Sequence, residues 1–279
     1  MSDNALDSYI DKWLAIQPQQ RIALPFVEGE GREGYVALAA LEQELIAAAY
    51  GIREPQVALA KLGWWAEELS GAAASGGRHP LTKALFADPR ARRVPGDRWV
   101  APVLAAMEQL DEGTAAHFEG QLAAATIMHG ALASLETAWW FGPEASPAKA
   151  SRVAALSHLL FALSRLEEDV DRERLPLPMA RLARFGLSRE QLRTDNPPRR
   201  EAVRAQLDEI ASGFRSARSI DGPLSLFRGL EARTGAAIAA RTRRAAEPLL
   251  AIHLGQSRTG LAAAFQAWRA ARDWRRRAV

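Results

Sequence analysis

The segment LSRLEEDVDRER, residues 163–174, gathers side chains that could bind a metal ion or a phosphate. In a helix, four of its charged residues would share one face, because they stand at positions i, i+3, i+4 and i+7: Arg165, Glu168, Asp169 and Arg172. Carboxylates at i and i+4 of such a face could hold Mg²⁺, which would in turn bind a diphosphate. Here the i position is Arg165, so we expect an ion pair between Arg165 and Asp169 instead. The alternative is a solvated helix end whose salt bridges add little stability.

Other catalytic patterns are missing from the sequence. The chain has no cysteine, which excludes disulfides, thiolate metal sites and cysteine nucleophiles. The five histidines form no HExxH pair, and we expect His129 and His158 to satisfy hydrogen bonds inside the protein. The glycines of GEGREG, residues 29–34, follow no predicted strand, so they do not indicate a dinucleotide site.

The net charge is small, +3 from 36 basic and 33 acidic residues. The basic residues are spread among acidic ones, so we do not expect nucleic-acid binding. No run of about 18 apolar residues indicates a transmembrane helix, and the acidic start MSDNALDSYIDKW does not resemble a secretory signal. We therefore expect a cytoplasmic protein, with peripheral contact at the inner face of the membrane as an alternative.

The composition predicts helices almost throughout, because alanine, leucine, arginine, glutamate and glutamine fill most windows. Glycine- and proline-rich breaks divide the chain into eight to ten helices. We find no repeat and no linker, so residues 1–279 are expected to form one all-α domain, a helical bundle. Its long helices are predicted at residues 35–49, 114–140 and 147–171.

The helices at 35–49 and 114–140 are apolar on almost every side, which places them at the centre of the bundle. Both are rich in alanine. Small side chains would leave a central cavity that could hold a prenyl chain or another lipid tail. The alternative is close packing of the two helices with no cavity.

The C-terminal segment, residues 261–279, is predicted to be a basic amphipathic helix. Leu261, Phe265 and Trp268 lie on one stripe, and arginines crowd the end of the segment. Arginines favour a helix C-terminus, which is one explanation of the pattern. Adhesion to an anionic membrane surface or to an acidic partner is the other.

The charged segment resembles a motif of the squalene and phytoene synthases, which join two prenyl diphosphates head to head. Their motif reads roughly N-x-x-R-D-x-x-E-D, then R-x-G-R-x-Y-L-P. In this chain its first part runs from Phe161 through Ser164 and Arg165 to Glu168 and Asp169. The two closing acids match, but the Asn, the Arg and the first Asp do not. Four residues of the second part also match: Arg172, Arg174, Leu177 and Pro178.

Two more segments resemble the same family. EPQVALAKLGWWAEEL, residues 54–69, is similar to one of its helices, and GRHPLTKAL, residues 77–85, to the turn that follows. The first acidic motif, D-D-x-x-D, departs most, because among residues 42–47 only Glu44 offers a carboxylate near the right place. This region is similar to a branch of the family that includes a mitochondrial complex I assembly factor. Members of this branch keep the fold but have lost part of their metal-binding motifs.

The resemblance implies an isoprenoid-synthase-like bundle in which Mg²⁺ ions between two acidic motifs neutralise the leaving diphosphate. Three candidate metal ligands remain here: Glu44, Glu168 and Asp169. We expect these to be too few for a metal cluster, so that no cofactor is used and head-to-head condensation is lost. Five basic side chains could then face the diphosphate of an isoprenoid or lipid without Mg²⁺: Arg53, Lys61, Arg165, Arg172 and Arg174.

Two other functions stay open at this point. The chain could be an assembly or interaction factor that binds a protein partner. It could also be an active prenyltransferase that condenses farnesyl or geranylgeranyl diphosphate at an altered Mg²⁺ site.

Overall fold

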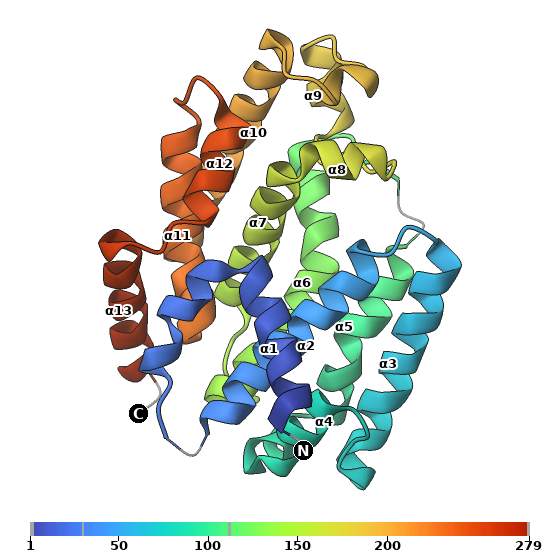
Figure 1. Ribbon diagram of the computed structural model, residues 1–279, viewed down its shortest axis with the longest axis vertical. Coiled ribbons are helices and arrows are strands. Elements are labelled where there is room, and N and C mark those ends of the chain that lie inside the picture. Colours follow the sequence, from blue (N-terminus) through green and yellow to red (C-terminus); the bar gives the residue numbers. More distant parts are fainter. Residues whose placement is uncertain (1–2, 30, 111–112, 278–279) are drawn as a thin grey trace.

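The computed structural model describes residues 3–29, 31–110 and 113–277, and within these ranges it contains helices and no strand (Figure 1). The all-α prediction is therefore confirmed. The α-helices are α1 Asp3–Ile16, α2 Arg32–Tyr50, α3 Pro55–Ser75, α4 Pro80–Ala87, α5 Gly96–Glu108, α6 Phe118–Phe141, α7 Ala148–Ser164, α8 Leu166–Asp171, α9 Met179–Arg184, α10 Pro197–Ser216, α11 Leu226–Thr242, α12 Pro248–Gln256 and α13 Leu261–Arg275. None of these described helices is both long and apolar enough to cross a membrane.

The two helices predicted at the centre are α2 and α6. Helix α6 packs against α5 and α7, and α2 packs against α1, α3 and α4. Figure 1 shows α3–α5 on one side of the molecule, α10–α13 on the other and α9 at one end. Two hydrophobic core clusters fill the bundle, and α6 and α11 contribute side chains to both of them. These shared helices join the N-terminal and C-terminal halves.

The prediction of one continuous helix over residues 147–171 is wrong. Helix α7 ends at Ser164, the backbone of Arg165 leaves the helical region at φ −102° and ψ 23°, and α8 begins at Leu166. The interruption is local to Arg165, because the backbone N–H of Asp169 still donates to the carbonyl of Arg165 as in a helix. The side chain of Arg165 nevertheless contacts Glu168 at i+3 and not Asp169 at i+4.

A buried ionic cluster ties α2, α6 and α11 together. The guanidinium of Arg228 donates to Glu42 at 2.9 Å, to Glu136 at 3.0 Å and to Glu231 at 2.6 Å. The side chains of Arg228, Glu42 and Glu136 are all about one-tenth exposed or less. Burial raises the pKa of Glu42, and the nearby Glu136 carboxylate raises it further, while Arg228 opposes the shift. This cluster fixes the separation and rotation of the three helices.

We predict that Arg228→Met destabilises the fold by about 3–5 kcal/mol, because it leaves three carboxylates buried without their cation. The free energy of unfolding in urea measures the effect. Arg233→Met is the matched control on the same helix, since Arg233 pairs with the half-exposed Asp273, and it should cost less than about 1 kcal/mol. Equal losses in the two variants would contradict the role assigned to the cluster.

A buried carboxylate outside this cluster, that of Glu68, closes the turn between α3 and α4. Glu68, with a side chain only 1% exposed, accepts the backbone N–H of Arg78 at 2.6 Å and of His79 at 2.9 Å, and the hydroxyl of Thr82 at 2.5 Å. Burial alone would raise the pKa of Glu68. The hydrogen bonds from Thr82, His79 and Arg78 outweigh burial and lower the pKa to about 2.

The stability that Glu68 contributes should depend on pH. Its pKa is depressed in the folded state, so the contribution is present above its ordinary pKa of 4.5 and is lost as the pH falls toward 2. Glu68→Gln should cost up to about 3 kcal/mol at pH 7 and progressively less between pH 4.5 and 2. Unfolding free energies across this range check the prediction, with the exposed neighbour variant Glu67→Gln as control. A penalty that does not change with pH would refute it.

Candidate functional site

The charged segment forms a compact cluster at α8, but its ion pairs differ from those predicted. Arg165 donates to Glu168, with Nη2 at 2.7 Å and Nε at 3.0 Å from Oε2. The expected side-chain pair between Arg165 and Asp169 is wrong. These two residues are joined through the backbone, since the N–H of Asp169 donates to the carbonyl of Arg165 at 2.9 Å. One of the two acids of the motif is thus already neutralised by an arginine.

Asp169 lies partly buried among arginines. Burial raises the pKa of Asp169, although the charges of Arg165, Arg174 and Arg172 act to lower it. The three arginines that the sequence assigned to a diphosphate therefore lie close enough to Asp169 to influence its ionisation. Glu168, whose charge also acts on Asp169, belongs to the same cluster, so three arginines face two carboxylates there.

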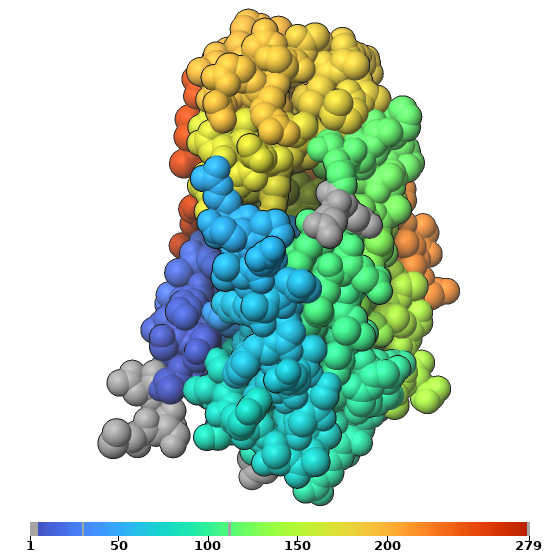
Figure 2. Space-filling view, turned by 90° about the vertical axis from the view of Figure 1, so that its right-hand side faces the viewer, coloured from blue at the N-terminus to red at the C-terminus, as the bar shows by residue number. Residues whose placement is uncertain are grey.

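Arg174 also has a structural task. Its guanidinium donates to the carbonyl oxygens of Tyr50 and of Ala49, the latter at 3.3 Å, and so caps the C-terminal end of α2. The chain reaches this position through Glu173, which has a left-handed backbone with φ 64°. Figure 2 shows this face, where the α2–α3 loop (blue) and the α8 segment (yellow) border a hollow in the surface.

The predicted residues of the first half do not join this cluster. Glu44 lies between two lysines, with Lys12 at 4.0 Å and Lys61 at 3.9 Å from its carboxylate oxygens. Lys61 is therefore engaged with Glu44, and Arg53 is exposed in the loop after α2. Among the described residues, no three acidic or histidine side chains lie close enough together to hold a metal ion. Glu44, Glu168 and Asp169 thus form no ready metal centre.

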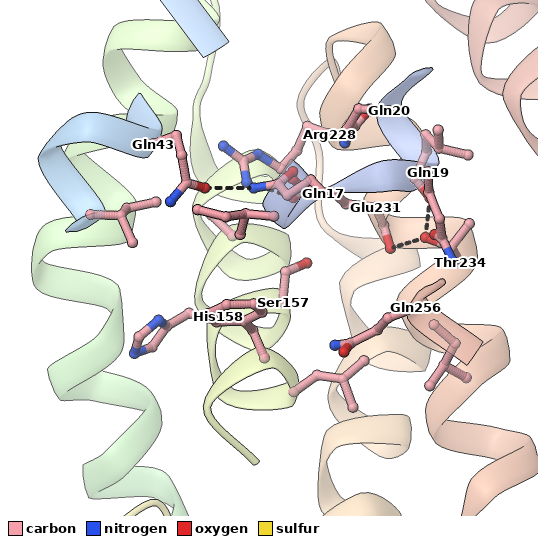
Figure 3. Close-up of a pocket in the computed structure, with 18 of the residues that line it drawn as sticks. Gln17, Gln19, Gln20, Gln43, Ser157, His158, Arg228, Glu231, Thr234 and Gln256 are labelled. Carbon is pink, nitrogen blue, oxygen red and sulfur yellow. Dashed lines mark hydrogen bonds and ion pairs between the residues drawn. The ribbon is translucent and has the colours of Figure 1, made fainter. Parts of the chain in front are cut away.

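A central cavity of about 140 Å³ lies between α2, α7, α11 and the 3-10 helix Pro18–Ile22 (Figure 3). It is not the space predicted between the alanines of α2 and α6, because these two helices contribute only Gln43, Ile46 and His129 to its lining. Its lining is more polar than we expected. The polar residues around it are Gln17, Gln19, Gln20, Gln43, His129, Ser157, His158, Arg228, Glu231, Thr234 and Gln256. The three glutamines of the segment QPQQ, residues 17–20, are the sequence signal that indicates this polar lining.

The cavity wall is polar but carries little free charge. His129 and His158 stack at 4.1 Å between ring centroids, and burial lowers the pKa of both, that of His158 to about 4. Both rings are therefore neutral near pH 7. The expected hydrogen bonding is wrong for His129, whose Nε2 is buried without a partner. Arg228, the cation on the wall, is already saturated by three carboxylates.

One end of the cavity approaches the arginine cluster. Phe161 lines the cavity, and the guanidinium carbon of Arg165 lies 5.5 Å from the centre of its ring. On the other side, Tyr50 packs against the cavity residue His158 at 4.6 Å and lies 5.7 Å from Arg174. Arg165 and Arg174 are thus each one side chain away from the cavity lining, while Arg165 and Glu168 themselves line a separate surface cavity.

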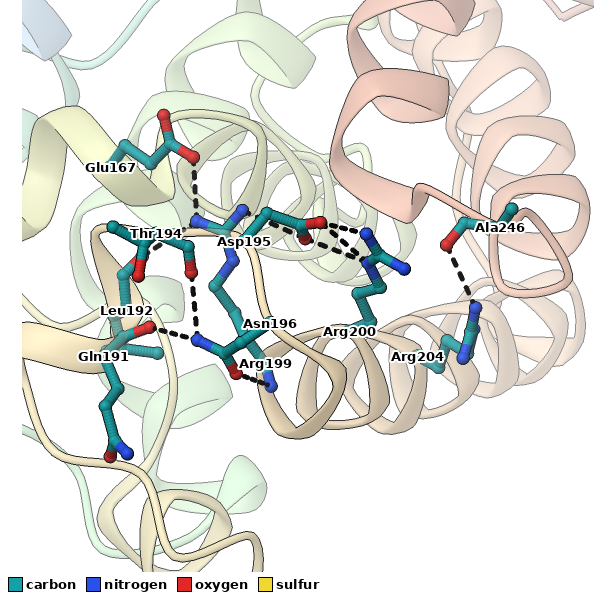
Figure 4. A network of polar contacts seen from close by, with 10 residues as sticks. All are labelled: Glu167, Gln191, Leu192, Thr194, Asp195, Asn196, Arg199, Arg200, Arg204 and Ala246. Atoms are coloured by element: carbon teal, nitrogen blue, oxygen red, sulfur yellow. Dashed lines mark hydrogen bonds and ion pairs between the residues drawn. The ribbon is translucent and has the colours of Figure 1, made fainter.

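A second network braces the outer side of α8 (Figure 4). Arg199 of α10 is buried and donates to Glu167 at 2.7 Å and to Asp195 at 3.3 Å, and Asp195 also pairs with Arg200. These residues border a surface cavity of about 540 Å³. Its arginines Arg199 and Arg200 are paired with carboxylates, so the network serves to anchor α8 to α10. The ion pair between Glu167 and Arg199 depends on how α8 packs against α10, so it could not be predicted from the local sequence.

Comparisons with known proteins agree with this architecture. A dehydrosqualene synthase solved in complex with a ligand has a similar structure, with a TM-score of 0.66 and 12% identity over 99% of this chain and 98% of that one. The squalene synthase HpnC from Alicyclobacillus acidocaldarius is also similar, with a TM-score of 0.60 and 18% identity over 86% of this chain and 94% of its own. At such identities these likenesses show the fold, which confirms the predicted isoprenoid-synthase-like bundle. No curated protein matches the sequence. The sequence model described as Squalene/phytoene synthase matches residues 21–270, and the chain therefore belongs to the squalene/phytoene synthase family.

Proposed function

We propose that this protein binds the diphosphate of a single isoprenoid or lipid without a magnesium cluster, and does not join two prenyl diphosphates. The observation that carries the proposal is the ion pair between Arg165 and Glu168. In the family motif an aspartate stands at the position of Arg165. The exchange removes one carboxylate and engages a second, which leaves Asp169 as the one acid of the motif without a side-chain ion pair among the described contacts.

The chemistry of condensation sets the requirement that this chain does not meet. A prenyl diphosphate ionises only when metal ions neutralise the departing diphosphate as its charge develops. Divalent ions need several oxygen ligands held together. Here Glu168 is paired with Arg165, and Glu44 is paired with Lys12 and Lys61. A metal ion would have to displace these cations before it could bind.

The same arginines support binding of an anion. Arg165 and Arg172 belong to the cluster around Asp169, and guanidinium groups bind phosphate oxygens through paired hydrogen bonds. Arg165 would have to leave Glu168, at least in part, to bind a phosphate in this way. Arg174 adds charge from its position on the end of α2. Arg53 follows Tyr50 by three residues and is exposed, so it is free to approach a ligand at this end. Lys61 would have to leave Glu44 to do so.

The size of the cavity favours one tail over two. Its volume is about 140 Å³, whereas pockets for drug-sized ligands commonly span about 300–1,000 Å³. A single prenyl or acyl tail would already require the lining helices to part. Head-to-head condensation needs two tails side by side, for which the chamber has still less room. The volume therefore argues against two tails, and binding of one tail depends on a widening of the cavity.

The alternative of an altered but active prenyltransferase is tested directly by product analysis. We expect no squalene, phytoene or cyclopropyl intermediate when the protein is incubated with farnesyl or geranylgeranyl diphosphate, Mg²⁺ and NADPH. An active squalene synthase assayed in parallel controls for substrate quality. Any of these three products, detected by mass spectrometry, would overturn the proposed lack of condensation.

Binding should be independent of metal and should depend on the α8 arginines. We predict that a non-hydrolysable farnesyl thiodiphosphate binds in the presence of EDTA, as measured by calorimetry. Arg165→Gln and Arg172→Gln should each weaken binding by about tenfold, the effect of losing one charged hydrogen bond. Arg215→Gln, an exposed arginine at the end of α10, is the matched control.

Three results of this experiment would count against the proposal. Binding that requires Mg²⁺ would favour the altered metal site with Glu168 and Asp169 as ligands. Equal affinities in the α8 variants and the control would place any ligand elsewhere, and complete absence of binding would favour a role as an assembly or interaction factor.

A further inference from the structure

Helix α13 turns three of its four bulky apolar side chains away from the protein. Leu261 is 92% exposed, Phe265 53% and Trp268 46%. The face that packs on the body consists of four alanines and, near the end of the helix, of Trp274, which contacts Trp140 at 5.1 Å between ring centroids. The alanines are Ala263, Ala267, Ala270 and Ala271. A helix that served only to cover the core would bury the large side chains and expose the small ones. The outward stripe is therefore not explained by packing within this chain.

The preceding helix continues the same pattern. Leu250 and Leu254 stand one turn apart on α12 and are 53% and 60% exposed. A short turn, residues 257–260, leads from α12 to α13, and Figure 1 shows both helices on the same side of the molecule. We call Leu250, Leu254, Leu261, Phe265 and Trp268 the apolar stripe. Within this set, Phe265 and Trp268 stack at 5.7 Å between ring centroids. Exposed apolar groups that gather in this way mark an interaction surface.

Arginines border the apolar stripe. The guanidinium of Arg269 lies over Phe265, 5.8 Å from the ring centre, and that of Arg272 lies over Trp268 at 5.1 Å. Three more arginines follow at the end of the helix, at residues 275–277, and all are exposed. The acid within α13, Asp273, is paired with Arg233 of α11. The stripe is thus apolar along its length and positively charged along its edge.

The groove behind α13 carries the same sign of charge. A cavity of about 870 Å³ lies between α13, α11 and the end of α10. Its charged lining consists of six basic residues and one acid, Asp273. The basic residues are Lys149, Arg218, Arg233, Arg269, Arg276 and Arg277. Both sides of α13 therefore favour an anionic neighbour.

We propose that the α12–α13 face is a docking surface for an anionic lipid bilayer. A bilayer offers an apolar layer for the leucines and aromatic rings and phosphate groups for the arginines beside them. Two copies of this chain meeting through the stripe would bring like charges together, which disfavours self-association as the occupant. Because α13 is already folded and packed through its alanines, docking would require no further ordering of the helix.

Leu250 borders the surface cavity that Arg165 and Glu168 also line. The test therefore changes residues of α13 only, and these are separate from the proposed ligand site. The test is co-sedimentation with vesicles of phosphatidylcholine alone and of phosphatidylcholine mixed with phosphatidylglycerol. We expect the full chain to pellet with the anionic vesicles only, and salt to weaken the binding. The double variant Phe265→Ser and Trp268→Ser should bind at least about tenfold more weakly.

The matched control removes equally exposed apolar groups elsewhere. Leu104 on α5 is 50% exposed and Ile127 on α6 is 44% exposed, so Leu104→Ser with Ile127→Ser should leave vesicle binding unchanged. Circular dichroism verifies that both double variants are folded. Size-exclusion chromatography of the wild type and the stripe variant measures their oligomeric state.

Three outcomes would overturn the proposal. The first is no sedimentation with anionic vesicles, and the second is equal binding to neutral and anionic vesicles. The third is a wild-type dimer that dissociates in the stripe variant while vesicle binding is absent, which would assign the stripe to contact between copies.

Discussion

The contact on which the central architecture depends is one guanidinium buried against three carboxylates. Arg228 joins α11 to Glu42 of α2 and Glu136 of α6, while Glu231 holds it from its own helix. Breaking such a cluster is costly because uncompensated charge would remain inside the protein. The geometry of the three helices is therefore fixed. Since Arg228 and Glu231 also line the cavity, the cluster sets the shape of one wall and leaves no free cation there.

The positive charge that can meet a ligand lies instead at the opposite end, around α8. There Arg165 has taken the position of a family aspartate, and Arg174 bonds the end of α2. Membership of the squalene/phytoene synthase family thus accounts for the bundle and its cavity. It does not by itself supply the metal chemistry, because a fold carries chemistry only through the side chains at its site. The sequence departs from the motifs that it resembles at two places, the acidic motif of α2 and the exchange at Arg165.

The two proposed surfaces occupy different parts of the bundle. The chamber and its arginines involve α2, α7 and α8, whereas the apolar stripe runs along α12 and α13. Together they describe a protein that could take up an amphiphile while held at an anionic bilayer. Separation of the surfaces on different helices means that each can be altered by substitution without changing the other. Their roles can thus be measured independently.

The sequence by itself determined the helical class, the central positions of α2 and α6, and the family resemblance, because these follow from local composition, periodicity and short motifs. It also located the arginines near Asp169, which are close in sequence. Only the tertiary structure decided that Glu44 faces two lysines and that Arg228 lies among buried acids. The contact between residues 42 and 228 spans 186 positions. Such pairings depend on how each helix is rotated in the bundle, and packing against distant segments, rather than local spacing, sets that rotation.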